Sequence, residues 1–262
     1  MPIKINEDLP AFRVLENENI FAMTEKRALV QDIRPLKVAI VNLMPTKATT
    51  ETQLLRLLAN TPIQIEISLI RMEQHVYKNT GTEYLDKFYI PSGEIFKRRF
   101  DGMIITGAPV EKLDFEQVDY WQELCTIMDY AKENVFSTLY LCWGAFAGLY
   151  HLYGIPKYPS DKKIFGVFKN RRTTSNDPLL RGMDDEFPVP QSRHTLLSKE
   201  DIKSNQELII LAESEESGVT LVKSKNNREV FMTGHLEYDT STLADEYRRD
   251  KSKNLPIDLP KN

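Results

Sequence analysis

The residues around Cys142 could carry nucleophilic chemistry. Cys142 follows an apolar run, Thr138–Leu141, and precedes small residues that include Gly144 and Ala145. This pattern predicts a strand that turns sharply into a helix and presents the thiol at the edge of a sheet. The start of that helix would stabilise a thiolate, and its N–H groups, beginning with that of Trp143, could hold an oxyanion. The alternative is a buried structural cysteine, because a free cysteine is often only a small apolar side chain.

A cysteine nucleophile needs a base, and His235 is the histidine best placed to be one. It follows an apolar strand that ends at Thr233, and Gly234 lets the chain turn there. Glu237, two residues on, can accept a hydrogen bond from the imidazole and fix its tautomer. A histidine and a glutamate at this spacing are common, so the prediction depends on their combination with Cys142.

The remaining histidines and the second cysteine have weaker settings. His75 lies in a polar insertion and His151 near a helix end, so we expect surface roles for both. His194 is expected in a loop, where it either lines the pocket or is exposed. Cys125 lies inside an amphipathic helical pattern, and we expect it to be structural.

Two further charged residues follow predicted strands. Lys47 comes after the first buried strand and either supplies a second oxyanion donor or simply begins a solvated helix. Glu111 comes after the third strand and either faces the pocket or only places favourable charge at a helix start. In an open α/β sheet the site lies outside the carboxyl ends of the strands, which is where both residues are expected.

Apolar runs and helical patterns alternate in the first half of the chain. Short apolar runs predict strands at 37–43, 102–107 and 138–142, and a period-two alternation predicts a half-exposed strand at 63–69. Helical patterns are found at 53–58, 115–133 and 144–149. This alternation predicts βαβ units around a parallel sheet.

The second half has strands without long helices between them. They are expected at 164–168, 207–212, 219–223 and 229–233. We interpret them as an antiparallel extension of the same sheet, since no Pro/Gly/Ser-rich linker divides the halves. The prediction is therefore one α/β domain over 1–262, flavodoxin-like, with a lead-in at 1–34 and a catalytic core at 35–240.

The bulk composition excludes several classes of protein. The 262 residues are 41% hydrophobic, enough for a substantial core, and the net charge of −4 with scattered basic residues favours neither a nucleic-acid nor a membrane surface. No apolar run is long enough to span a bilayer, and the first ten residues lack a signal-peptide pattern. Two cysteines make no disulfide framework, so we expect a cytoplasmic protein.

Several segments together resemble a known family, the homoserine O-acyltransferases of the MetA type. The resemblance rests on the segments Val41–Lys47, Thr106–Glu111, Cys142–Ala145, Pro190–Thr195 and Gly234–Asp239. It covers essentially the whole chain. It implies a fold like that of the class I glutamine amidotransferases and a role in the first committed step toward methionine.

The resemblance also implies roles for individual residues. It places the acyl-thioester cysteine at Cys142, the base at His235 and its acidic partner at Glu237. It places substrate contacts at Lys163, Ser192 and Arg249, and acyl-donor specificity at Glu111 and Ser192. It implies L-homoserine and an acyl-CoA as substrates, a homodimer, and neither a metal nor a cofactor beyond the acyl-CoA co-substrate.

The choice of acyl donor is predicted from Glu111. The family resemblance associates a glycine at this position with the use of succinyl-CoA. A glutamate adds a negative charge, and two like charges about 5 Å apart repel by roughly 3 kcal/mol, which would disfavour the succinyl carboxylate about a hundredfold. We therefore expect acetyl-CoA, with homoserine O-succinyl transfer as the alternative. Related members continue a few dozen residues past Asn262, so the C-terminal tail is expected to be incomplete.

Two other functions use the same fold. A glutamine amidotransferase would use the same cysteine, histidine and glutamate, but its elbow has a glycine two residues before the cysteine, where this chain has Tyr140. A non-catalytic binding protein would need none of the three residues. Both are weaker interpretations than acyl transfer by a ping-pong mechanism.

Overall fold

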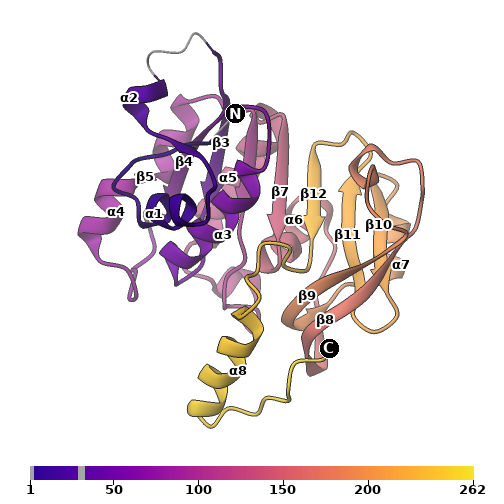
Figure 1. Ribbon diagram of the computed structural model, residues 1–262. Helices are drawn as coiled ribbons and strands as arrows, with labels where there is room; N and C mark the ends of the chain where they lie inside the picture. Colours follow the sequence, from indigo (N-terminus) through magenta and orange to yellow (C-terminus); the bar gives the residue numbers. More distant parts are fainter. Residues whose placement is uncertain (1–2, 29–32) are drawn as a thin grey trace. The chain divides into compact units, whose positions relative to one another are not determined.

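The computed structural model describes residues 3–28 and 33–262 (Figure 1). The expected lead-in is described except at 1–2 and 29–32, which lie outside the described residues. The chain forms two compact units. The first comprises the described residues of 1–109 together with 116–138, and the second comprises 110–115 and 139–262.

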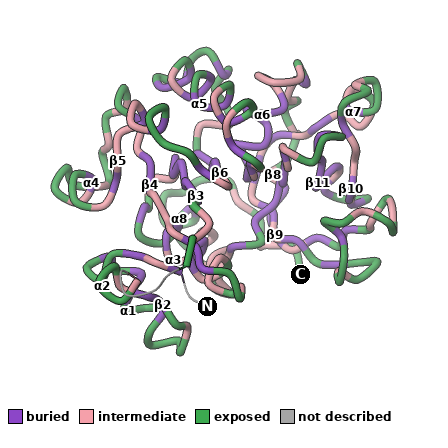
Figure 2. The backbone as a smooth tube through the Cα atoms, turned by 90° about the horizontal axis from the view of Figure 1, so that it is seen from above, coloured by how far each residue is buried: buried purple, intermediate pink, exposed green. Residues whose placement is uncertain are grey.

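The first unit is built on a parallel sheet. Its strands are β1 (Ile3–Lys4), β2 (Ala22–Met23), β3 (Leu36–Val41), β4 (Ile65–Arg71), β5 (Tyr89–Pro91) and β6 (Gly102–Ile105). The sheet order is β2-β1-β4-β3-β6, with β5 beside β4, and the pairs are parallel. The last four residues of β3 are all buried (Figure 2), which is why this part of the strand is a continuous apolar run.

The longer helices of the first unit, α1 (Pro10–Asn17), α3 (Lys47–Ala59) and α5 (Trp121–Asn134), each bury several residues, whereas α2 (Glu25–Ala28) buries none. The unit also contains α4 (Thr82–Phe88) and 3₁₀ turns at η1 (Ser92–Lys97) and η2 (Phe115–Gln117). The helix expected from 115 therefore begins at Trp121, after a separate 3₁₀ turn. A 3₁₀ turn repeats every three residues, close to the α-helical 3.6, so the apolar pattern continues through it.

The second unit contains the antiparallel strands. They are β7 (Ser137–Leu141, shared with the first unit), β8 (Tyr158–Arg172), β9 (Glu186–Leu196), β10 (Leu208–Ser214), β11 (Gly218–Ser224) and β12 (Glu229–Met232). Their order is β7-β12-β11-β10-β8-β9, antiparallel from β12 onward. Its helices are α6 (Trp143–Tyr153), α7 (Lys199–Ser204) and α8 (Thr242–Ser252), with η3 at Pro178–Leu180. The predicted α/β class, with parallel strands followed by antiparallel ones, is confirmed.

The longest feature of the second unit is the ribbon of β8 and β9, which run side by side in Figure 1. The sequence does not predict β9, and the expectation that His194 lies in a loop is wrong. Buried positions alternate along β9, but three of them are Gln191, Arg193 and Thr195. Polar side chains on the buried face hide the apolar alternation that marks a strand.

The chain after α8 returns to β8. Lys261 N–H donates to the Phe165 carbonyl (3.0 Å), and Val167 N–H donates to the Lys261 carbonyl (2.8 Å). Gly166 between them has φ +140°, and a Cβ there would lie 2.3 Å from the Lys261 carbonyl oxygen. Only glycine admits this approach, so the sequence of β8 is adapted to the returning segment.

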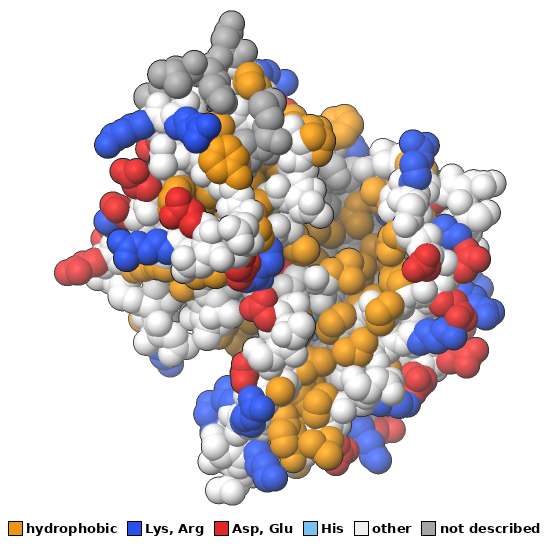
Figure 3. Space-filling model, in the orientation of Figure 1, with side chains coloured by type: hydrophobic (Ala, Val, Ile, Leu, Met, Phe, Trp, Pro, Cys, Tyr) orange, Lys and Arg blue, Asp and Glu red, His pale blue; other side chains and the backbone are white. Residues whose placement is uncertain are grey.

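The surface has mixed charge. Figure 3 shows one face, on which acidic and basic side chains are interspersed. Across the described ranges 3–28 and 33–262, no helix combines the length and apolar character that crossing a bilayer requires.

Candidate active site

Cys142 occupies the turn between β7 and α6. Its backbone has φ 47° and ψ −118°, a conformation that costs a non-glycine residue about 1–3 kcal/mol. Hydrogen bonds hold it there: Cys142 N–H donates to the Met232 carbonyl (2.8 Å), and the Cys142 carbonyl accepts from Ala145 N–H (2.9 Å). The strained turn places the thiol directly before the first residue of α6, Trp143. This is the geometry expected of a nucleophile elbow.

Close packing fixes the start of α6. Its first seven residues are all buried, so the helix is a core element. Tyr140, two residues before the cysteine, stacks on Phe231 with ring centroids 4.8 Å apart. A Cβ at Gly148 would lie 2.7 Å from the Tyr140 ring and 2.9 Å from Phe231. The large Tyr140 side chain therefore fits against α6 only because residue 148 is a glycine.

His235 and Glu237 meet in the second unit as the sequence predicts. His235 Nδ1 lies 2.6 Å from Glu237 Oε1, and both side chains are buried. The Cys142 thiol lies close enough to the ring to raise the pKa of His235. His235 N–H donates to the Pro190 carbonyl (2.9 Å), which anchors the backbone to β9. The structure thus brings the thiol, the imidazole and the carboxylate together.

The electrostatics favour a charged ring. Burial alone lowers the pKa of His235, but the charges of Cys142 and Glu237, and their hydrogen bonds to the ring, outweigh it and hold this pKa well above 6.5. Tyr238 stacks on the ring at 4.1 Å, and burial raises the pKa of its phenol, which stays neutral. An imidazolium beside a sulfur is the arrangement that yields a reactive thiolate.

The three expected substrate contacts converge on one carboxylate, Glu246 of α8. Its Oε1 accepts from Lys163 Nζ (2.7 Å) and from Ser192 Oγ (2.7 Å). Arg249 lies 3.4 Å from the same oxygen and 2.7 Å from Asp250. Sequence reasoning missed Glu246, and its only signal is the i,i+3 spacing to Arg249 on one helix face.

Asp250 completes this cluster. Its carboxylate lies 3.2 Å from Lys163 Nζ, besides its contact with Arg249. Burial raises the pKa of Asp250, but hydrogen bonds from Arg249 and Lys163 outweigh burial and hold it below its usual value. The cluster therefore presents fixed charges of both signs, which suits a ligand with a carboxylate and an amine.

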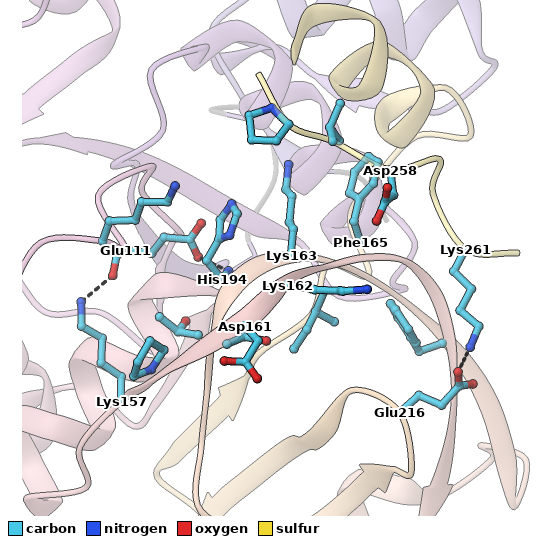
Figure 4. Close-up of a pocket in the computed structure, with 18 of the residues that line it drawn as sticks. Glu111, Lys157, Asp161, Lys162, Lys163, Phe165, His194, Glu216, Asp258 and Lys261 are labelled. Atoms are coloured by element: carbon cyan, nitrogen blue, oxygen red, sulfur yellow. Dashed lines mark hydrogen bonds and ion pairs between the residues drawn. The ribbon is translucent and has the colours of Figure 1, made fainter. Parts of the chain in front are cut away.

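Glu111 lies at one side of a cavity of about 1120 Å³ within the second unit. The Glu111 carboxylate accepts a hydrogen bond from the His194 backbone N–H (2.8 Å), and Lys157 Nζ donates to the backbone carbonyl of Glu111 (2.7 Å). Figure 4 shows Glu111, His194 and Lys163 along the cavity, with Lys261 at the opposite end beside Glu216. Of the two interpretations left open for Glu111 and for His194, the geometry favours a place in the pocket lining.

Lys47 belongs to the first unit. It is the first residue of α3 and is almost fully buried. Its Nζ donates to the Asn42 carbonyl and lies 4.8 Å from the Tyr77 ring centroid. Burial lowers its pKa to about 8, although the charge of Glu51 opposes the shift. The solvated helix start is thus excluded, while a role for Lys47 toward the thiol stays a prediction.

Solved structures similar to this chain show its fold. A glutamine amidotransferase from Thermotoga maritima aligns with a TM-score of 0.57 at 11% identity, covering 84% of each chain. A glutamine amido transferase from Methylobacillus flagellatus aligns with a TM-score of 0.54 at 13% identity, covering 86% of this chain and 78% of that one. The expected likeness to the class I glutamine amidotransferase fold is confirmed.

Sequence relatives are much closer. A homoserine O-acetyltransferase of Petrotoga mobilis is 60% identical over 262 residues, which is all of this chain and 85% of the relative. One from Acetivibrio thermocellus is 58% identical and one from Bacteroides fragilis 55%, each over all of this chain and 86% of the relative. The family described as homoserine O-succinyltransferase matches residues 2–262. The chain belongs to this family of homoserine acyltransferases.

Proposed function

We propose that this protein transfers an acetyl group from acetyl-CoA to the side-chain hydroxyl of L-homoserine, through an acetyl-cysteine at Cys142. The observation that carries this proposal is the hydrogen-bonded pair of His235 and Glu237, whose ring interacts with Cys142 at the strained elbow. The relatives named homoserine O-acetyltransferase support the choice of substrates. The reaction would serve methionine biosynthesis.

In the first half-reaction the Cys142 thiolate attacks the thioester carbonyl of acetyl-CoA. The carbon–sulfur bond to coenzyme A breaks, and the leaving thiolate takes the proton from the imidazolium of His235. The Trp143 N–H, at the first position of α6, is the proposed oxyanion donor. Glu237 keeps the ring oriented while its charge changes.

In the second half-reaction homoserine binds at the Glu246 cluster. Glu246 is suited to the substrate amine, and Lys163 and Arg249 to its carboxylate. Ser192, which now donates to Glu246, can turn to the ligand. The neutral His235 then takes the hydroxyl proton, the oxygen attacks the acetyl carbon, and the bond to Cys142 breaks. Water must be excluded from the acetyl-cysteine, or it hydrolyses without product.

The acetyl donor is assigned through Glu111. The His194 N–H holds this carboxylate beside the cavity, where a succinyl carboxylate would meet a like charge. Ser192, on the strand that also carries His194, is the second specificity position. Like-charge repulsion of roughly 3 kcal/mol is about a hundredfold in rate.

Three properties complete the proposal. The thiol, imidazole and carboxylate are sufficient for both half-reactions, so the enzyme is proposed to work without a metal or prosthetic group. It is proposed to act in the cytoplasm, where its thiol stays reduced. It is proposed to be a homodimer, which light scattering of the purified protein tests directly.

A donor comparison tests the proposal. Purified enzyme is given L-homoserine with either acetyl-CoA or succinyl-CoA at matched concentrations, and coenzyme A release is measured with a thiol reagent. We expect a kcat/KM about a hundredfold higher for acetyl-CoA. Faster succinyl transfer would reject the interpretation of Glu111, and no transfer to homoserine from either donor would reject the proposed function.

A further inference from the structure

The guanidinium of Arg193 is buried among neutral hydrogen-bond acceptors. The residue is 1% exposed. Its Nε donates to Gln191 Oε1 (3.0 Å), and its two terminal nitrogens donate to the carbonyls of Thr195 and Ser217. Among the residues that the structure describes, no carboxylate forms a salt bridge with it. A buried charge normally requires a counter-charge, because desolvation costs several kcal/mol.

The register of β9 places Arg193 beside the first turn of α6, which follows Cys142. Ser192 and His194, on one face of the strand, contact Glu246 and Glu111. Arg193 points to the opposite, buried face, where its guanidinium lies 5.9 Å from the ring centroid of Phe146 in the first turn of α6. The same strand anchors the base, since the Pro190 carbonyl accepts from His235 N–H.

We propose that Arg193 is a positioning residue for the acyl-transfer reaction, whose positive charge behind α6 stabilises the Cys142 thiolate and, after attack, the oxyanion. The inference rests on the proposed function in taking Cys142 as the nucleophile. The counter-charge of this buried guanidinium is then the negative charge that the catalytic cycle itself creates.

The electrostatic environment of Arg193 supports this assignment. Burial lowers the pKa of Arg193 to about 10, and the two negative charges that oppose the shift are those of Cys142 and Glu111. A guanidinium with this pKa stays charged throughout the working range of the enzyme. Its fork of donors is held by two backbone carbonyls, so it needs no reorganisation when charge develops at the sulfur.

The thiol's own titration tests the assignment without either substrate. Carbamidomethylation of Cys142 by iodoacetamide is followed against pH by mass spectrometry of the Cys142 peptide, which excludes signal from Cys125. In Arg193→Met and Arg193→Gln, loss of the charge should raise the midpoint of the rate profile by about one pH unit. Arg193→Lys keeps the charge and should stay within about 0.3 unit of wild type.

A matched control separates charge from packing. Gln191→Met removes a neutral partner of Arg193 but keeps the guanidinium, so it should lower the melting temperature and leave the midpoint in place. An equal shift in Gln191→Met, or no shift in a folded Arg193→Met or Arg193→Gln variant, overturns the proposal. If neither neutral variant folds, Arg193→Lys decides, because a one-unit shift with the charge retained also overturns it.

These outcomes are distinct from failure of the proposed function. Alkylation reports the thiolate whether or not acetyl-CoA or homoserine is a substrate. If the alkylation midpoint rises as expected in the neutral Arg193 variants but the wild type transfers no acyl group, the proposed reaction is rejected and the electrostatic role of Arg193 stands. Normal acyl transfer by the wild type, together with an unshifted alkylation midpoint in the neutral Arg193 variants, would keep the proposed reaction and reject the electrostatic role of Arg193.

Discussion

At the scale of single residues, His235 is charged by its surroundings. A buried imidazole is ordinarily neutral, because desolvation disfavours the cation. Here Glu237 hydrogen-bonds the ring, and the charges of Cys142 and Glu237 raise the pKa of His235 well above 6.5 despite burial. The ring is therefore favoured in its charged form, in which it carries a proton that it can release.

The same pair makes stability depend on pH. Because the folded-state pKa of His235 lies above its unfolded value, the stabilisation is fully present below about pH 6.5 and is lost as pH rises through the raised pKa. Glu237→Gln removes one of the two negative charges that raise the pKa of His235. The wild type should exceed this variant in free energy of unfolding at low pH, and the difference should shrink as pH rises. Urea unfolding across a pH series measures it.

If the difference in free energy of unfolding between wild type and Glu237→Gln stays constant or grows as pH rises, the ion pair of His235 and Glu237 is contradicted. Glu186→Gln serves as the control, because Glu186 pairs with Lys169 and Arg171 on the exposed part of the ribbon. Solvent screens such pairs, so this change should leave the pH trend of the wild type unaltered.

Donor choice is also proposed to depend on one side chain, that of Glu111. Glu111→Gly removes the carboxylate that His194 N–H holds at the cavity. The ratio of kcat/KM for succinyl-CoA to that for acetyl-CoA should rise by about a hundredfold, because the like-charge repulsion is removed. Steady-state rates with both donors measure this ratio.

Asp114→Gly is the matched control for donor choice. Asp114 lines the same cavity, so its loss changes the total charge there by the same amount. It should leave the donor ratio within about threefold of wild type, since its charge is exposed and screened. An equal change in both variants would assign specificity to the general charge of the cavity rather than to Glu111.

Sequence reasoning reaches some of these residues and not others. Cys142, His235 and Glu237 carry local signals, a turn of small residues and a two-residue spacing. Lys163, Ser192 and Arg249 come only from the family resemblance. Arg193 has no local signal and Glu246 has only its spacing to Arg249, because the roles of both arise when β9 and α8 bring distant parts of the chain together.

At the scale of elements, β9 supports much of the site. It contributes Ser192 to the Glu246 cluster, fixes Glu111 through His194 N–H, and anchors His235 through the Pro190 carbonyl. Pairing with β8 over most of its length keeps it rigid. A strand is a more precise support for such a site than the loop predicted for this segment.

Gly234 is where β9 meets the segment that carries the base. A Cβ there would lie 2.3 Å from Val189 Cγ1 and 2.9 Å from the Pro190 carbonyl oxygen. Gly234→Ala should therefore push His235 away from β9 and lower the free energy of unfolding by about 1–3 kcal/mol. It should also lower kcat. Urea unfolding and steady-state kinetics measure the two effects.

Gly81→Ala is the control for this prediction. Gly81 has no atom within 4 Å of an added Cβ, so the change should cost less than about 1 kcal/mol. Unaltered stability and kcat in Gly234→Ala would show that β9 can move away from the base and would contradict its supporting role.

Elements are predictable where their pattern is apolar. The buried strands β3 and β6 are found at their places because both faces are covered and the sequence is a continuous apolar run. The N-terminal elements β1 and β2 are two residues each, too short for any periodicity to show. The pattern of α1 covers only eight residues.

At the scale of the whole molecule, the order of strands places the chemistry. The cysteine directly follows β7, the histidine follows β12, and these two strands are neighbours although about ninety residues separate them. The α/β class follows from alternating strand and helix patterns. The neighbourhood of β7 and β12 does not, because strand order depends on packing between distant segments. The long ribbon and the C-terminal return to β8 are equally non-local.

The proposed mechanism requires a covalent acetyl-cysteine, which can be trapped and identified. The protein is mixed with radiolabelled acetyl-CoA in the absence of homoserine, quenched in acid and digested, and the labelled peptide is identified by mass spectrometry. We predict one acetyl group on Cys142, present in Cys125→Ser, absent in Cys142→Ala and discharged by L-homoserine. Label on any other residue, or acetyl transfer that proceeds undiminished in Cys142→Ala, would contradict the account.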